Sequence, residues 1–329
     1  MSVENLLKKY TKNTFNYYYK NTKNYEKNIV CKNEYNIVPK KGKYIIITFA
    51  DKINNNKLGI ERIKKMSILK EKLKDNSHID EFIIYTLNDI DMRFKEKHFQ
   101  LFNSCKFFAW ISKIYLINKM FEKIDDDDIV LWIDSDVRDI QKEGTLNLFS
   151  LCENSENNLV GFHNNFWLEQ YYCKRELLRY MNMENEIFTN TQQIYGGIVL
   201  FKKNQFVLKI MKEWLDISIA SNYIYFNDNI KLKQLDAFIG HRHCQSILSL
   251  LFKKYNVKTF PLPLVNMDKN DIIAVSAGYF DHSNFLPILW EPCWHDNTIE
   301  ETYKNCVKKI KKNIDEKTLL ISLNYLLLK

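Results

Sequence analysis

The chain has little of what marks a membrane protein or a disulfide-bonded secreted protein. No apolar stretch in its 329 residues approaches the roughly 20 residues that a membrane-spanning helix needs. Residues 1–43 are rich in lysine, asparagine and tyrosine and lack the apolar core of a signal peptide. The seven cysteines form an odd set without a Cys-x-x-Cys pair, which argues against a disulfide framework and against a zinc site. We therefore expect a soluble, cytoplasmic protein with reduced thiols.

The chain also lacks internal repeats and any Pro- or Gly-rich linker, since it has only eight glycines and five prolines. Its hydrophobic content of 46% is enough for a globular core and excludes a disordered chain. The net charge of +8 is dispersed along the sequence, whereas a nucleic-acid-binding protein would need a concentrated basic face. We expect one domain, 43–305, with an N-terminal extension, 1–42, and a C-terminal helix, 306–329.

Short β-branched and apolar runs, typical of buried strands, alternate with segments of helical spacing. The runs predict strands at 43–49, 82–85, 129–133, 159–162 and 198–201. Apolar residues at helical spacing predict helices around 60–73, 107–121 and 207–214. This alternation predicts an α/β fold with a mixed, mostly parallel sheet flanked by helices, a Rossmann-like arrangement.

The most informative motif is Asp134-Ser135-Asp136, directly behind the apolar run 129–133. A buried strand would carry these two carboxylates at its C-terminal end, where open α/β sheets bind ligands. Hard cations such as Mg²⁺ or Mn²⁺ take oxygen ligands, often one or two carboxylates together with substrate phosphates. The motif therefore predicts a metal–diphosphate site. Two solvated loop acids are the alternative, because Asp-x-Asp is also common by chance.

Four other segments could line the same site, and each has a purely structural alternative. A nucleotide base could lie on the Thr48-Phe49-Ala50-Asp51 loop, and Lys113 is a cation on the helix before the Asp-x-Asp strand. The alternatives are a plain strand-to-helix loop and a surface lysine.

The other two segments lie later in the chain. Gln193 and the pair Gly196-Gly197 lead into a strand, where glycines permit close approach to a ligand or form a tight turn. The stretch His241-Arg242-His243-Cys244-Gln245-Ser246 opens a helix, a position suited to a sugar or phosphate or to simple capping. Near the C-terminus, His282 and His295 could complete a metal's coordination.

The order of these pieces resembles a GT-A-fold, nucleotide-sugar-dependent glycosyltransferase over residues 43–300. The layout is similar to glycogenin-like retaining enzymes. It is more similar still to a group found in bacteria, eukaryotes and large DNA viruses, which shows "Tyr-Thr-Lys-Arg-Asp" and "His-Arg-x-Asp-Gln-Ser". Here these motifs stand as Tyr172-Cys173-Lys174-Arg175-Glu176 and His241-Arg242-His243-Cys244-Gln245-Ser246.

The resemblance implies a sugar transfer from a nucleoside-diphosphate sugar, with UDP favoured, to a glycan or protein acceptor, with retention of configuration. It implies Mn²⁺ or Mg²⁺ as cofactor, and a virus-infected host cell or a virion as one setting. By the resemblance, Asp134, Asp136 and His295, with His282 as the alternative, hold the metal. The catalytic positions are Lys113, Cys244 and Gln245, and the residues that bind the donor are Thr48, Phe49, Ala50, Asp51, Lys113, Ser135, Gln193, Gly196, Gly197, His241 and Arg242.

The chain departs from the group at Cys244, where the motif has Asp. A thiol has an ordinary pKa of about 8.5 and does not replace a carboxylate as a charged acceptor unless it ionises. A non-catalytic homologue that still binds nucleotide sugar is therefore the main alternative. A metal-dependent phosphatase of the Asp-x-Asp type would need a Thr shortly after Asp136, and Val137-Arg138-Asp139 lacks it.

Overall fold

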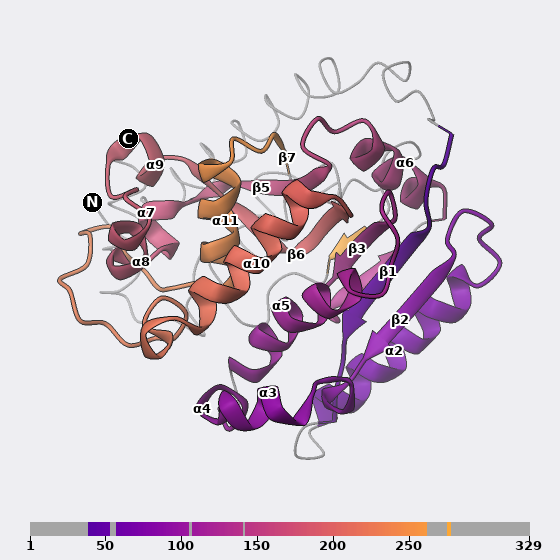
Figure 1. The fold of residues 1–329 in the computed structure, drawn as a ribbon, viewed down its shortest axis with the longest axis horizontal. Helices are drawn as coiled ribbons and strands as arrows, with labels where there is room; N and C mark the ends of the chain where they lie inside the picture. The colour runs from indigo at the N-terminus through magenta and orange to yellow at the C-terminus, as the bar shows by residue number, and fades with distance from the viewer. Residues whose placement is uncertain (1–38, 53–56, 105–106, 141, 262–274, 278–329) are drawn as a thin grey trace, which may run out of the picture. The chain divides into compact units, whose positions relative to one another are not determined.

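The computed structural model describes residues 39–52, 57–104, 107–140, 142–261 and 275–277 (Figure 1). They all belong to one compact unit, Tyr35–Ala277. The predicted extension, apart from 39–42, and the predicted C-terminal helix 306–329 lie outside the described residues. The expected domain limits therefore stay predictions.

The core of this unit is a sheet of six strands in the order β2-β1-β3-β6-β5-β7. The strands are β1 Tyr44–Phe49, β2 Glu81–Tyr85, β3 Ile129–Ile133, β5 Leu159–Leu168, β6 Gln192–Lys202 and β7 Thr259–Pro261. Strands β2, β1 and β3 are parallel, and β5 is parallel to β7, whereas β6 runs antiparallel to both β3 and β5. The predicted α/β class with a mixed, mostly parallel sheet is confirmed.

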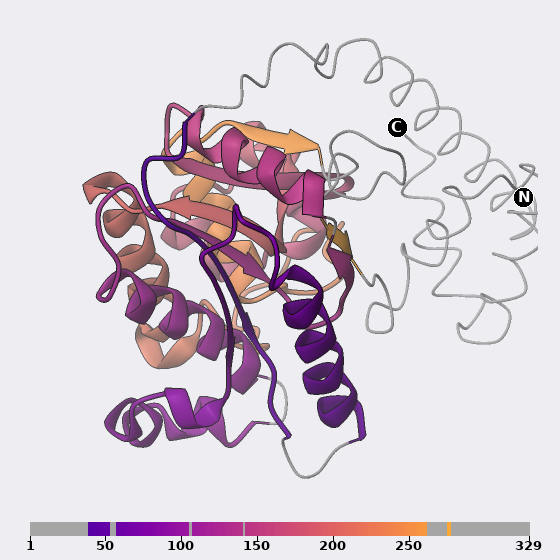
Figure 2. The ribbon, with the colours of Figure 1, turned by 90° about the vertical axis from the view of Figure 1, so that its right-hand side faces the viewer.

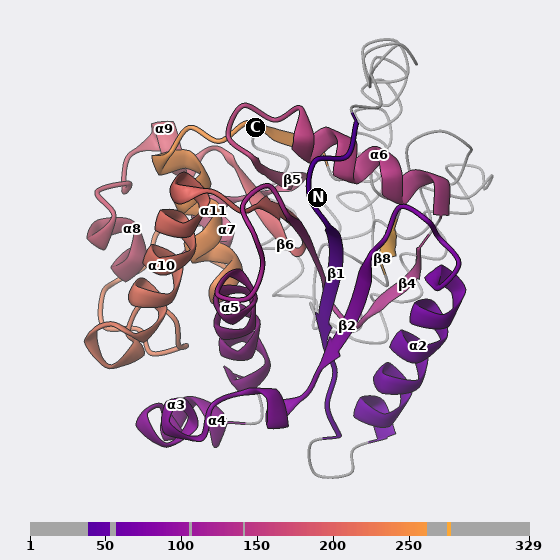
Figure 3. The same cartoon turned by 45° about the vertical axis from the view of Figure 1, so that its right-hand side comes forward.

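Helices cover both faces of the sheet (Figures 2 and 3). On one face lie α5 Phe107–Phe121, α10 Gln205–Ile219 and α11 Cys244–Lys254; on the other lie α2 Lys57–Leu73 and α6 Lys142–Glu153. Side chains alternate along the strands accordingly. Ile45 and Ile47 join the buried cluster with α5 and α10, whereas the ring of Tyr44 stacks on Phe149 of α6 with centroids 4.4 Å apart.

The remaining elements are short. The helices are α3 Met92–Lys97, α4 Phe99–Phe102, α7 Glu169–Tyr172, α8 Arg175–Tyr180 and α9 Glu186–Thr189, with 3₁₀ turns at Leu87–Asp89 and Ser221–Tyr223. A separate two-stranded sheet pairs β4 Val137–Ile140 with β8 Val275–Ala277. In the part of the chain that the structure describes, no helix is both long enough and apolar enough to cross a bilayer.

The topology marks one place on the sheet edge. From β1 the chain passes through α2 to β2 on one side, and later through α5 to β3 on the other side of β1. The order of the strands therefore reverses at β1, and the carboxyl ends of β1 and β3 lie next to each other at this switch point. In open α/β sheets a crevice forms at such a switch point, and ligands bind there.

Candidate functional site

The switch point brings together the first two segments that the sequence singles out. Strands β1 and β3 are parallel, with Ile47 opposite Trp132. The segment Thr48–Asp51, whose first two residues end β1, and the motif Asp134–Asp136, which follows β3, therefore lie side by side at the carboxyl edge of the sheet. Ser135, between the two carboxylates, is buried.

Asp134 is held by groups from three elements. Its Oδ1 lies 2.6 Å from the Nζ of Lys113 on α5 and accepts a hydrogen bond from the Nε1 of Trp132 at 2.7 Å. Its main-chain N–H donates to the carbonyl oxygen of Gly197 on β6 at 2.8 Å. The first carboxylate of the motif is therefore fixed in place by the protein itself.

Lys113 is buried, with 5% of its side chain exposed, so the alternative of a surface lysine is wrong. Besides Asp134, its Nζ donates to the carbonyl oxygen of Gly196 at 2.9 Å. Burial lowers the pKa of Lys113, but the charge of Asp134, the hydrogen bond to it and the charge of Asp136 outweigh burial and raise the pKa. Lys113 is therefore a permanent cation next to both carboxylates.

Asp136 differs from Asp134, because its Oδ1 is buried and has no hydrogen-bond partner in the described structure. Burial, followed by the charge of Asp134, raises the pKa of Asp136 to about 6, against the opposing charges of Arg62 and Lys113. On the other side, Lys65 donates to the main-chain oxygen of Asp136 at 3.1 Å. A buried carboxylate oxygen without a donor is open to a cation, which would favour the ionised form.

The donor set suits a hard divalent cation. Mg²⁺ is commonly bound by one or two carboxylates together with substrate phosphates instead of a complete protein cage. The described residues contain no group of three His, Cys, Asp or Glu side chains that could hold a metal, and the Asp134–Asp136 pair does not require one. The expected further ligands, His295 and His282, lie outside the described residues.

Gly196 and Gly197 lie inside strand β6 and not in a tight turn, so the turn interpretation is wrong. Among the described glycines none has a positive φ. A Cβ at Gly197 would come within 2.3 Å of the ring of Tyr195, and one at Gly196 would meet Gln245 at 3.2 Å. Space for these two protein side chains accounts for both glycines, whose carbonyl oxygens bind Lys113 and Asp134.

Gln245 and Gln193 form a buried amide chain. Gln245 Oε1 accepts from the N–H of Gly196 at 3.0 Å, and its Nε2 donates to Gln193 Oε1 at 2.7 Å. Gln193 in turn donates to Glu169 Oε2 at 2.9 Å, and Lys253 pairs with the same carboxylate. Gln193 and Glu169 are fully buried. These hydrogen bonds fix Gly196 on strand β6, whose carbonyl oxygen accepts from Lys113.

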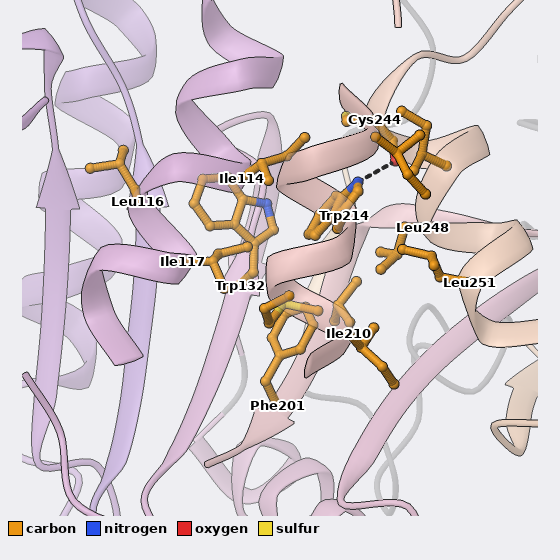
Figure 4. Packing of buried hydrophobic residues seen from close by; sticks show 14 of the residues in the cluster. Ile114, Leu116, Ile117, Trp132, Phe201, Ile210, Trp214, Cys244, Leu248 and Leu251 are labelled. Carbon is orange, nitrogen blue, oxygen red and sulfur yellow. Dashed lines mark hydrogen bonds between the residues drawn. The ribbon is translucent and has the colours of Figure 1, made fainter. Parts of the chain in front are cut away.

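Cys244 is the first residue of α11 and lies close to the same charges. Its thiol is buried, and burial raises the pKa of Cys244 to about 11, with Lys113 lowering it and Asp134 raising it. Its carbonyl oxygen accepts a hydrogen bond from the Nε1 of Trp214 at 2.9 Å, drawn dashed in Figure 4. The group at this position is therefore a neutral thiol beside Lys113.

The segment Thr48–Asp51 is closely packed, and Thr48 and Phe49 are part of strand β1 instead of a loop. Thr48 is fully buried, and its Oγ1 has no hydrogen-bond partner in the described structure. Phe49 is 7% exposed and meets Phe108 edge to face, so little of its ring is open to a base. Ala50 donates to the oxygen of Tyr85 at 2.9 Å, and the carboxylate of Asp51 accepts from the N–H of Leu87 at 2.6 Å.

His241 and Arg242 contact α7 and residues around it instead of the two carboxylates. Nε2 of His241 lies 2.9 Å from the oxygen of Tyr225, and burial lowers the pKa of His241 well below its ordinary value, so the ring is neutral. The guanidinium of Arg242 lies between Trp167 and Tyr172, 4.5 and 4.8 Å from the ring centroids.

The motif 172–176 also has a structural account. Lys174 is fully buried, and its Nζ donates to the carbonyl oxygen of Asn229 at 3.4 Å and to that of Asn227 at 2.5 Å. Glu176 accepts from the N–H groups of Lys231 and Leu232. These contacts tie down the segment 227–234, which leads towards Cys244.

Sequence reasoning missed Arg62 and Lys65 on α2. Their spacing from buried apolar residues of the same helix could have indicated them. Arg62 stands four residues before the buried Met66, and Lys65 four before the buried Leu69. Both cations therefore continue the side of α2 that faces the sheet.

No protein-family model matches the chain, and none of the curated proteins is significantly similar to it in sequence.

Proposed function

We propose that the chain is a GT-A-fold glycosyltransferase that moves a sugar from a nucleoside-diphosphate sugar to a glycan or protein acceptor. The observation that carries the proposal is the Asp-x-Asp pair at the switch point, with Lys113 beside Asp134 and a buried, unpartnered oxygen on Asp136. The order of motifs in the sequence supports the same function. Retention of configuration and a preference for UDP are part of the proposal and rest on the resemblance.

Asp136 would hold Mn²⁺ or Mg²⁺ directly, and Asp134 would do so directly or through water. Such a cation supplies Lewis-acid stabilisation of the charge that develops on the departing diphosphate, worth several kcal/mol. Lys113 keeps Asp134 in position and adds a permanent positive charge on the α5 side. Preorganised charges of this kind stabilise a transition state without reorganisation during the reaction.

A catalytically weak or inactive homologue that still binds nucleotide sugar is the second candidate. The observation that favours it is Cys244, a buried neutral thiol near Lys113 where the similar group has a carboxylate. Both candidates require nucleotide binding at Asp136. They differ in turnover, so measuring donor hydrolysis and transfer separates them.

The test is a thermal-shift panel of nucleoside diphosphates and their sugars, with and without Mn²⁺, on the wild type and Asp136→Asn. A ligand at a hundred times its Kd stabilises the native state by about 2.7 kcal/mol, which a melting curve resolves. We expect a metal-dependent shift in the wild type and none in Asp136→Asn. Asp126→Asn, at an exposed acid before β3, is the matched control and should respond like the wild type. An equal shift in Asp136→Asn would remove the central argument.

A further inference from the structure

Helix α2 presents two cations on the side that faces the sheet. Its buried residues Met66, Leu69 and Leu73 recur at helical spacing. Arg62 and Lys65 continue this stripe towards the N-terminus of the helix, and both are half-buried. Burying a charge costs free energy unless a partner offsets it, so the groups that lie near these two cations decide their role.

The N-terminal part of α2 lies at the switch point (Figure 3). A Cβ on Gly59 would come within 2.4 Å of the main-chain oxygen of Asp51, so the first turns of α2 pack on the loop that leaves β1. Six residues further along the helix, Lys65 donates to the main-chain oxygen of Asp136 at 3.1 Å. Arg62 lies between these two contacts along the helix.

Asp136 therefore lies between cations from two sides, Lys113 on α5 and the α2 pair Arg62 and Lys65. The buried Oδ1 of Asp136 accepts no hydrogen bond from a described residue. The fully buried Oγ1 of Thr48, at the end of the adjacent strand β1, is also without a partner. A divalent cation on the Asp136 oxygen, together with a phosphate group that accepts hydrogen bonds from Arg62 and from the Thr48 hydroxyl, would satisfy all of these groups.

We propose that Arg62 and Lys65 form a phosphate-binding arm, which would hold the donor's diphosphate from the α2 side, next to the cation on Asp136. The inference rests on the proposed function and adds two binding residues to it. A guanidinium binds phosphate oxygens through two parallel hydrogen bonds, whereas an ammonium acts as a point charge. Arg62 is therefore the principal residue of the arm and Lys65 the supporting one.

A purely neutralising role for Arg62 makes the opposite prediction. If Arg62 only offsets the charge of Asp136, Arg62→Gln removes a competitor of the metal, and Mn²⁺ with nucleotide binds as well as before or better. If Arg62 holds phosphate, the same variant binds nucleotide more weakly, and the loss grows with the number of phosphates.

The experiment measures the affinities of UDP, UMP and uridine by calorimetry in the presence of Mn²⁺. It uses the full chain as wild type, Arg62→Gln, Lys65→Gln and the control Lys64→Gln, which lies on the exposed side of the same helix. We expect Arg62→Gln to weaken UDP binding about ten- to hundredfold, the value of one charge-assisted contact. The loss should be smaller for UMP and absent for uridine, and Lys64→Gln should bind like the wild type.

Arg62→Lys controls for a folding defect, because it keeps the charge and removes only the guanidinium group. Its UDP affinity should lie between those of the wild type and Arg62→Gln, and its melting temperature should be unchanged. If Asp136→Asn abolishes UDP binding but Arg62→Gln binds UDP like the wild type, the phosphate-binding role of Arg62 is wrong and the proposed function stands. A wild type that binds no nucleoside diphosphate with Mn²⁺ would overturn both.

Discussion

Replacing Lys113 by Met tests whether Lys113 holds Asp134 and Gly196 in place, and the quantity measured is the free energy of unfolding instead of activity. The Nζ of Lys113 lies 2.6 Å from Asp134 Oδ1 and 2.9 Å from the oxygen of Gly196. Methionine has a similar volume and flexibility but no charge, so it removes these two interactions and the cation–π contact with Trp132 with little loss of packing. The carboxylate and the carbonyl group both lose a donor.

The size of the effect follows from burial. Breaking a buried ion pair by removing one partner costs about 3–5 kcal/mol, because the other charge is left uncompensated. The side chain of Asp134 is 32% exposed, so water replaces part of the lost interaction, and Trp132 still donates to it. We expect a loss of about 2–3 kcal/mol, which lowers the melting temperature by roughly 5–10 °C at about 2–4 °C per kcal/mol for a domain of this size.

Urea unfolding of Lys113→Met, Asp134→Asn and the double variant forms a double-mutant cycle. The double variant should cost at least 0.5 kcal/mol less than the sum of the single variants, since residues in direct contact couple by roughly that amount or more. Lys119→Met on the same helix, which loses a hydrogen bond to the oxygen of Asp89 and a contact with the ring of Tyr115 but breaks no ion pair with a described residue, should cost about 1 kcal/mol.

The pH dependence gives a further check. The pKa of Lys113 is raised, so its stabilising contribution is fully present below the unfolded pKa of about 10.4 and is lost only as the pH rises through the higher folded value. The cost of Lys113→Met should therefore be constant between pH 8 and 9, above the range in which Asp136, whose pKa Lys113 lowers, titrates. The contact between Lys113 and Asp134 would be refuted if Lys113→Met unfolded with the free energy of the wild type. It would also be refuted if the losses of the two single variants added up to the loss of the double variant.

Two further predictions concern other buried groups. Cys244→Asp places a carboxylate beside Lys113 and should change donor preference or transfer rate about ten- to hundredfold, since a carboxylate accepts charge-assisted hydrogen bonds from sugar hydroxyls; a lower melting temperature with an unchanged donor profile would show that Cys244 is only a packing residue. For His163, burial and then the charge of Lys253 lower the pKa to about 4, so its contribution is complete above about pH 6.5 and is lost as the pH falls towards 4. His163→Gln should therefore lose less stability than the wild type in urea unfolding between pH 6.5 and 4, and equal slopes for the two proteins would contradict this.

The strands could be predicted because each buried segment carries its own apolar run. Strands β1, β3 and the apolar half of β6 begin or end within one residue of the predicted limits. The direction of β6 could not be predicted, since an apolar run has the same composition in either direction. The position of Gly196 and Gly197 inside β6 also escaped prediction, because it depends on the ring of Tyr195 and on Gln245 from α11, and neither contact leaves a local pattern.

Charged residues were harder to place. Lys113 could be named because it precedes a strand that ends in Asp-x-Asp, but its burial depends on the partner Asp134. Arg62 and Lys65 are two of 48 basic residues, and composition does not distinguish them from solvated cations. Only their phase relative to Met66 and Leu69 marks them, and this phase becomes informative once α2 is known to lie against the Asp136 end of the sheet.

The two carboxylates of the motif have different surroundings, and this decides how their variants are to be interpreted. Asp134 is engaged by Lys113, Trp132 and Gly197, so its replacement disturbs the protein before any ligand is present. Asp136 keeps a buried oxygen without a partner, so its replacement removes little from the free protein and most from a bound complex. Loss of nucleotide binding in Asp136→Asn at an unchanged melting temperature therefore reports on ligand contacts, whereas the same loss in Asp134→Asn would also follow from a displaced Lys113.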